Sequence, residues 1–268
     1  MSYSNYYKKS NLFHGSTINI MGTRLDVIMI GCESPLSKTW EQIIAETERL
    51  HRMLNRFDTT SEISLVNRNA SVHPVEVNDE LWHIMKEIKI YHHQTLGYFD
   101  ISLRDYNQVV LDEARRTVFF AEKDIYLDLG GYAKGYALEQ IREILLNNEV
   151  KQALVNFGNS SILAIGSHPH GKNWSIGIEN PFCPGQQLNV CELYDQSLSV
   201  SGNSIQRANH IFNPHSGKFC EERKIVSVVS INAIEAEVLS TSCMVADEKS
   251  FLSIQKVFGN AIINIFVV

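Results

Sequence analysis

Asp128-Leu129-Gly130-Gly131-Tyr132-Ala133-Lys134-Gly135-Tyr136 is the stretch around which the rest of the sequence can be interpreted. Residues 124–127 before it are typical of a short strand, and the apolar residues after it recur at helical spacing. Glycines at a strand–helix junction let the backbone approach a ligand, and the helix start offers unpaired N–H groups to a phosphate. Lys134 would oppose the helix dipole there but would suit an anionic ligand. A tight turn with a surface lysine is the alternative.

Length and composition describe a globular chain of moderate acidity. Its 268 residues can bury a sizeable core, as one large domain or two small ones. The 24 basic and 30 acidic residues give a net charge of -6, which argues against a nucleic-acid-binding surface. The five cysteines contain no CxxC pair, so neither a zinc site nor a disulfide framework is indicated.

The sequence also bears on the compartment. No stretch approaches the roughly 18 apolar residues of a membrane span. The polar first residues lack the apolar core of a signal peptide. We therefore expect a cytoplasmic protein from the sequence as written, although a chain whose leader had been removed would look the same.

Strands and helices are mixed without a regular βαβ alternation, which predicts an α+β fold. Residues 1–20 are expected to form a flexible segment before a single domain over residues 21–268. Helices are predicted from period and capping at 38–55, 79–95, from 133 onward, and at 233–246. Strands are predicted at 24–30, 153–157, 162–165, 174–178, 198–201, 225–231 and 261–267.

The last predicted helix carries a candidate cation site. Glu237, Ser240 and Thr241 lie at positions i, i+3 and i+4, and therefore on one face of the helix. Three oxygen-bearing side chains on one face can hold a hard cation such as Mg²⁺. The alternative is a polar helix face whose acid is favoured by the helix dipole.

A third candidate lies around the turn that contains Pro214. His210 precedes this turn and has the right side chain to act as a base near neutral pH, with His215 as a competitor. A lone histidine in a loop is also commonly just exposed. Asp100 and Asp128 lie beside glycines, and either could cap a turn, which is the simpler role for Asp100 taken alone.

Taken together and in order, these stretches resemble the ApbE family of bacterial FAD:protein FMN transferases, also called thiamine-biosynthesis lipoproteins. The resemblance spans roughly residues 21 to 245, and residues 128–135 are its most specific part. The matching motifs are Met21-Gly22-Thr23, residues 61–67, Gly97-Tyr98-Phe99-Asp100, residues 128–135, Ser201-Gly202, residues 210–214 with Gly217, and residues 236–241.

The resemblance implies an α+β fold of mixed sheets with flanking helices and an FAD site between the lobes. It implies an enzyme that binds FAD with Mg²⁺, cleaves the pyrophosphate, and places FMN on a Ser or Thr of a partner flavoprotein, releasing AMP. It assigns catalysis to His210. FAD would be surrounded by Met21, Phe57, Tyr98, Phe99, Asp100, Asp128, Lys134 and Phe212, with the adenine near residues 98–100. The metal would take the Gly131 backbone oxygen and the Glu237, Ser240 and Thr241 side chains.

Several positions depart from the family pattern. Asp is usual where Glu237 stands, Tyr where Phe57 stands, Asp where Asn213 stands, and a second glycine where Asn159 stands. Most members also carry an export or lipoprotein signal, so an extracytoplasmic location would follow if a leader had been removed. The departures leave two other functions open. One is a protein that binds FAD without transferring it, and the other is an FAD pyrophosphatase that releases FMN and AMP.

Overall fold

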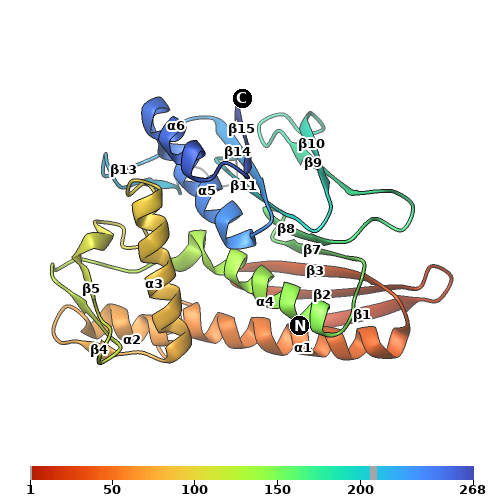
Figure 1. Cartoon of the computed structure of the whole chain (residues 1–268), viewed down its shortest axis with the longest axis horizontal. Coiled ribbons are helices and arrows are strands. Elements are labelled where there is room, and N and C mark those ends of the chain that lie inside the picture. Colours follow the sequence, from red (N-terminus) through yellow and green to blue (C-terminus); the bar gives the residue numbers. More distant parts are fainter. Residues whose placement is uncertain (1, 206–209) are drawn as a thin grey trace.

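One antiparallel sheet of eight strands forms the centre of the computed structural model, which describes residues 2–205 and 210–268 (Figure 1). The strand order is β1-β2-β3-β7-β8-β11-β14-β15. Every neighbouring pair in this order is antiparallel. The strands are β1 (Ser2–Tyr7), β2 (Leu12–Ile20), β3 (Thr23–Ile30), β7 (Ala153–Phe157), β8 (Ser161–Ile165), β11 (Ser197–Gly202), β14 (Lys224–Ser230) and β15 (Ile262–Val267).

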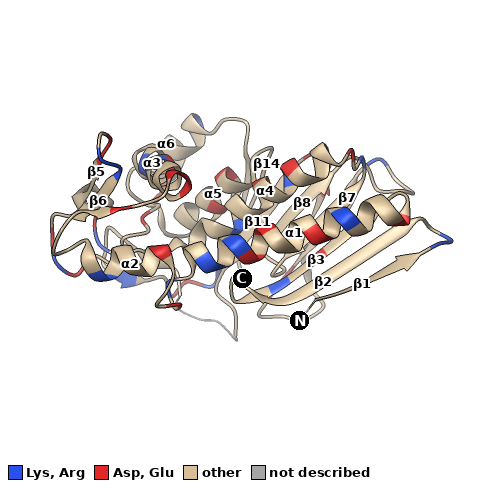
Figure 2. Cartoon of the chain, turned by 90° about the horizontal axis from the view of Figure 1, so that it is seen from below, with Lys and Arg blue, Asp and Glu red and all other residues tan. Residues whose placement is uncertain are grey.

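Three helices cover one face of this sheet: α1 (Glu33–Leu54), α4 (Ala133–Asn147) and α5 (Ala233–Val245). The long helix α1 buries Trp40, Ile43 and Leu50 at helical spacing, while its charged residues are spread along its length (Figure 2). Helix α5 is buried on nearly all sides because it packs against α4, β11 and β14. The candidate site forms where α4 and α5 meet.

A second lobe stands beside the sheet (Figure 1). It contains α2 (Glu62–Asn69), α3 (Asp79–Gln94) and a small sheet of β4 (Val75–Glu76), β6 (Thr117–Phe120) and β5 (Val109–Asp112). Tyr91 of α3 stacks on Phe258, which follows α6 (Glu248–Val257). One hydrophobic core therefore runs from the main sheet through both lobes.

The other face of the main sheet is partly covered by a hairpin of β9 (Trp174–Glu179) and β10 (Gln187–Leu193). A smaller hydrophobic cluster, including Trp174, Ile178 and Leu198, lies beneath it. A short hairpin of β12 (Phe212–Asn213) and β13 (Lys218–Phe219) carries the turn at Pro214. Two 3-10 turns, η1 (Tyr106–Gln108) and η2 (Leu129–Gly131), complete the described elements.

The α+β class is confirmed, and the predicted helices and strands are found close to their expected bounds. The expectation of a flexible N-terminal segment is wrong, because residues 2–20 form β1 and β2 of the main sheet. The apolar alternation that marks a strand is weak there, since β2 buries Gly15, Ser16 and Thr17. Gly15 lies under Trp40, where an added Cβ would be 2.6 Å from the indole.

The prediction of a short strand at residues 124–127 is also wrong, because this segment joins no sheet. It is held instead by hydrogen bonds to Asn67 of α2 and to the loop at residues 101–102. In the part of the chain that the structure describes, no helix combines the length and apolarity needed to cross a membrane.

Candidate active site

The glycine turn that follows residue 128 is held from two sides. Asn67 of α2 accepts the Leu127 N–H at 2.8 Å and donates to the Leu127 carbonyl at 3.0 Å. The Asp128 N–H donates to the Ile101 carbonyl at 2.7 Å. The Asp128 side chain caps the turn, because its Oδ1 accepts the Gly130 N–H at 2.9 Å. These bonds fix the backbone that leads into η2 and α4 without any strand pairing.

An open pocket of about 140 Å³ lies on one side of this turn. Met21, Phe57 and Asp128 line it together, so three residues that the resemblance assigns to FAD meet there. The Phe57 ring is 78% exposed, and the Arg56 guanidinium lies 4.3 Å from its centroid. Arg56 also pairs with Asp128, with 3.2 Å between Nε and Oδ2. An exposed aromatic face beside a cation and a carboxylate suits a flat, polar ring.

Met21 enters this pocket from the turn between β2 and β3. Its φ of 48° places it in the left-handed region, and its N–H donates to His51 Nδ1 at 3.0 Å. That hydrogen bond ties the turn to the last turn of α1. The pocket is therefore assembled from three separate segments of the chain.

A largely buried charge pair forms at the start of α4, directly after the glycine turn. Lys134 Nζ donates to both oxygens of Glu237, at 3.1 Å to Oε1 and 2.9 Å to Oε2. The Glu237 side chain is 5% exposed and that of Lys134 is 20% exposed. The two residues meet because α4 and α5 pack closely at Gly135. A Cβ added there would lie 2.7 Å from the Ala233 carbonyl and 2.9 Å from Glu237 Cγ.

Serine hydroxyls from the sheet surround the Glu237 carboxylate. Ser161 of β8 donates to Oε1, as does Ser199 of β11 at 2.8 Å, and Lys134 also donates to Ser161 Oγ. Ser240 Oγ continues the network, lying 2.9 Å from Ser199 Oγ and 2.8 Å from Ser201 Oγ. A buried polar group is costly unless it is hydrogen-bonded, and these hydroxyls supply the hydrogen bonds of the Glu237 carboxylate inside the fold.

The four groups predicted to hold a metal are only partly brought together. Gly131 lies against Thr241, since a Cβ added at Gly131 would be 3.3 Å from Thr241 Oγ1. Glu237 and Ser240, by contrast, are engaged by Lys134 and by the sheet serines. Oxygen donors of this kind fit a hard cation such as Mg²⁺. Glu237 would join Thr241 in binding one only after exchanging its Lys134 contact.

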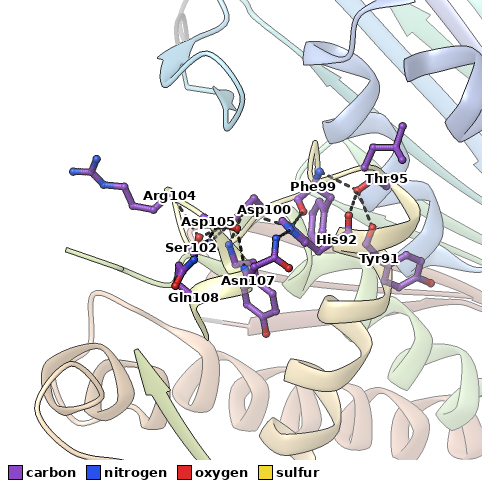
Figure 3. A network of polar contacts seen from close by, with 12 residues as sticks. Tyr91, His92, Thr95, Phe99, Asp100, Ser102, Arg104, Asp105, Asn107 and Gln108 are labelled. Carbon is purple, nitrogen blue, oxygen red and sulfur yellow. Dashed lines mark hydrogen bonds and ion pairs between the residues drawn. The ribbon is translucent and has the colours of Figure 1, made fainter. Parts of the chain in front are cut away.

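Asp100 belongs to a separate network at the end of α3 (Figure 3). Its carboxylate accepts the N–H groups of Ser102 at 2.7 Å and Tyr106 at 2.9 Å, so it caps the turn that follows. His92 Nδ1 lies 3.0 Å from the Phe99 carbonyl and 3.4 Å from Asp100 Oδ2. A pocket of about 440 Å³ opens beside this network, lined by Asp100, His92 and His215 among others.

Tyr98 and Phe99 are buried, with 7% and 2% of their surfaces exposed. The Tyr98 hydroxyl donates to Asp247 Oδ2 at 2.8 Å, and the ring stacks on His215 with centroids 4.1 Å apart. Phe99 packs against Gly131, where an added Cβ would be 3.5 Å from its ring. Little of either ring is therefore available to stack on an adenine in this conformation, whereas the Phe57 ring is open.

The loop that carries His210 is fastened to the end of α5. Asn213 Nδ2 donates to the Val245 carbonyl at 3.3 Å, and its Oδ1 accepts the His215 and Ser216 N–H groups. A carboxylate could not make the first of these bonds, so Asn213 has a structural role of its own. Phe212 packs edge-on to Phe219, with centroids 5.6 Å apart. His210 is half-buried directly before this hairpin and follows residues 206–209, which lie outside the described part.

Arg56, Ser161 and Ser199 are site residues that the sequence analysis did not single out. Arg56 could have been noticed as a cation beside Phe57 in a turn-rich loop. Ser161 stands in a strand whose other residues are apolar and buried, and Ser199 is a buried serine in a strand where serines alternate with apolar residues. A hydroxyl at such a position implies a buried polar partner, but the partner can be named only once the packing of α5 is known.

Comparisons with known proteins agree with the order of the motifs. The ApbE family profile matches residues 21–105 and 101–262. The FAD:protein FMN transferase of Klebsiella pneumoniae is 30% identical over 149 residues, covering 50% of this chain and 43% of that protein. The FAD:protein FMN transferase of Chlamydia muridarum is 25% identical over 234 residues, covering 73% of this chain and 72% of that protein.

The fold is also shared with solved structures. The flavin transferase ApbE from Vibrio cholerae superposes with a TM-score of 0.81 at 19% identity, covering 98% of this chain and 93% of that one. The ApbE protein from Thermotoga maritima superposes with a TM-score of 0.82 at 20% identity, covering 99% and 94%. At these identities the likeness establishes the fold.

Proposed function

The chain belongs to the ApbE family, and we propose that it is a Mg²⁺-dependent FAD:protein FMN transferase. In this reaction the FAD pyrophosphate is cleaved and AMP leaves. The flavin-bearing phosphorus forms a phosphoester with a Ser or Thr hydroxyl of a partner flavoprotein. The single observation that carries the proposal is that Lys134 of α4 pairs with Glu237 of α5 while Thr241 of the same helix lies against Gly131.

We place the adenine half of FAD in the pocket of Phe57, Met21 and Asp128. The open Phe57 ring can stack on the base, and the Arg56–Asp128 pair can meet its polar edge. The sequence alone suggested residues 98–100 for this role, and their burial favours the Phe57 pocket. Tyr98, Phe99 and Asp100 would then support the site from behind, while the flavin half extends towards Phe212.

The pyrophosphate would lie over the Gly130–Gly131 turn, within reach of Lys134. The Gly131 carbonyl, Glu237, Ser240 and Thr241 would hold the divalent cation, which neutralises the charge that develops as the pyrophosphate breaks. His210 would take the proton of the incoming hydroxyl as the new phosphoester forms.

Incubation with FAD and Mg²⁺ tests the proposal, run with and without a flavoprotein domain that carries an acceptor Thr. Covalent flavin on the acceptor, together with AMP, is the expected result. FMN and AMP without an acceptor would identify an FAD pyrophosphatase, in which water replaces the hydroxyl.

A second function, FAD binding without transfer, is favoured by one observation. The Glu237 carboxylate is already neutralised by Lys134 and bonded by Ser161 and Ser199. If this arrangement persisted with FAD bound, then FAD would bind without forming any product. The same incubation separates this outcome from the other two.

A further inference from the structure

We propose that Lys134 and a divalent cation compete for the Glu237 carboxylate, so that metal binding releases Lys134 towards the FAD pyrophosphate. The inference rests on the proposed function for its FAD half only. Its metal half concerns a buried charge pair that is fully described, and it can be tested without FAD.

The carboxylate of Glu237 has little room for a further ligand in the observed arrangement. Two carboxylate oxygens together offer about four lone-pair positions. Among the described residues, Oε1 accepts from Ser161, Ser199 and Lys134, and Oε2 accepts from Lys134. A cation bound beside the Lys134 ammonium would also meet a like charge in a poorly solvated place. Lys134 must therefore leave before Glu237 can take a metal.

The N–H donors of the Lys134 ammonium are likewise in use. An ammonium has three N–H donors, and the described contacts of Nζ are the two Glu237 oxygens and Ser161 Oγ. Lys134 therefore has no donor to spare for a phosphate while it stays on Glu237. Its side chain is a flexible stem with a point charge, which can reorient without movement of the helix. Ser161 and Ser199 can keep their bonds to the carboxylate during the exchange.

This arrangement links the two ligands thermodynamically. A metal that binds Glu237 releases Lys134, which can then bind the pyrophosphate. In the same way, a pyrophosphate that binds Lys134 leaves Glu237 available to the metal. Each ligand should raise the affinity for the other by the same factor. If Lys134 and Glu237 stayed paired and the metal bound elsewhere, Lys134 would not couple the affinities for the metal and for FAD.

The first experiment titrates the FAD-free protein with Mn²⁺, followed by its paramagnetic resonance signal. Lys134→Met should bind Mn²⁺ about tenfold more tightly than the wild type, because a buried carboxylate that loses its partner is left uncompensated. Lys86→Met is the matched control, since Lys86 pairs with Glu113 at the exposed surface, and it should leave Mn²⁺ affinity unchanged. Equal or weaker Mn²⁺ binding by folded Lys134→Met would overturn the proposal.

The second experiment measures FAD affinity by calorimetry in EDTA. Glu237→Gln should bind metal-free FAD as tightly as the wild type or more tightly, because Lys134 is no longer held by a carboxylate. A loss of affinity in this folded variant would overturn the exchange. Failure of the wild type to bind FAD would count against the proposed function instead, and would leave the Mn²⁺ result standing.

A measurement on the wild type alone covers the case in which Lys134→Met does not fold. FAD titrations with and without Mn²⁺, and Mn²⁺ titrations with and without FAD, should give the same coupling factor, well above one. A factor of one would contradict the exchange.

Discussion

The charge cluster at Glu237 and the pocket at Phe57 both adjoin the segment from Asp128 to Gly135, and they differ in almost every physical respect. The cluster is built on two helices and two strands, and its carboxylate is fully hydrogen-bonded. The pocket is built from turns and helix ends, and its main contact surface is the exposed Phe57 ring. Under the proposed function, we expect bond breaking in the interior, at the hydrogen-bonded cluster, and ligand recognition at the exposed rim. The predictions below test this division.

Replacing Glu237 should have the largest effect. Glu237→Ala removes the one charged side chain among the proposed metal ligands, so AMP release from FAD should fall about a hundredfold or more. FAD binding should survive in part, because the Phe57 pocket is untouched. Glu113→Ala, which removes an exposed carboxylate, is the control. Unchanged AMP release in Glu237→Ala would move the chemistry away from this cluster.

Glu237→Asp sharpens the same test. It restores the length that is usual in the family, so under the transferase hypothesis activity should hold or rise. The shorter side chain should also reach Lys134, Ser161 and Ser199 less well. If the chain only binds FAD, Glu237→Asp should produce little transferase activity, because Asn213 and Asn159 still differ from the family pattern.

The close packing of α4 and α5 predicts a loss of stability for Gly135→Ala. An added methyl would meet the Ala233 carbonyl at 2.7 Å, a backbone atom that cannot turn away. Overpacking of this kind typically costs about 1–3 kcal/mol, against a helix-propensity gain of about 1 kcal/mol for alanine. Denaturant unfolding should therefore show a lower stability, whereas Gly259→Ala, with its nearest contact at 4.0 Å, should change little.

Lys134→Ala tests whether the cluster also contributes to recognition. A charge-assisted bond to phosphate is worth roughly 1.5–3 kcal/mol, so FAD affinity in the presence of Mg²⁺ should fall about tenfold or more. The remaining binding should also depend less on salt, because one ionic contact is lost. An unchanged dissociation constant by calorimetry would leave Lys134 as a partner of Glu237 alone.

Much of the fold could be predicted because its elements carry local signals. Helices α1 and α3 have apolar periodicity, and α3 has an Asn78 cap that accepts from Leu81. Strand β2 carries only a weak signal, since Gly15, Ser16 and Thr17 are among its buried residues and Gly15 fits under Trp40. Residues 124–127 mislead in the opposite way, because Ile125 and Leu127 are buried although the segment pairs with no strand.

The candidate site was predicted as a set of residue types but not as an arrangement. The motif order places Asp128, Lys134 and Glu237 in one site, yet no spacing rule indicates that Glu237 reaches Lys134. That contact depends on how closely α4 and α5 approach at Gly135. The role of Asn67 is likewise non-local, since it brackets the Leu127 backbone from a helix 60 positions earlier in the chain.

A smaller effect is expected from a substitution in the Phe57 pocket. Phe57→Ala removes the exposed ring, and an aromatic contact of about 0.5–1.5 kcal/mol predicts a loss of FAD affinity of about fivefold. FMN affinity should hardly change, because FMN has no adenine to stack there. We also expect the wild type to bind FAD more tightly than FMN. Equal affinities for FAD and FMN by calorimetry would exclude an adenine pocket.

The smallest effect is expected at Tyr98, which decides whether residues 98–100 contact FAD or only support it. The backbone N–H of Ser250 and the Tyr98 hydroxyl lower the pKa of the Asp247 carboxyl, which caps α6. A carboxyl whose pKa is lowered by folding stabilises the protein above the pKa of the unfolded chain, and this contribution is lost as the pH falls.

Tyr98→Phe should therefore lower the melting temperature slightly at pH 7, and the difference from the wild type should shrink as the pH falls below about 4, the ordinary range of an aspartate. The ring and its stacking on His215 are kept in this variant, so FAD affinity should not change if the buried Tyr98 only supports the site. A clear loss of FAD affinity with an unchanged melting temperature would instead place the Tyr98 hydroxyl on the ligand. The adenine would then belong beside residues 98–100, and the division between a rigid interior and a recognising rim would fail at this point.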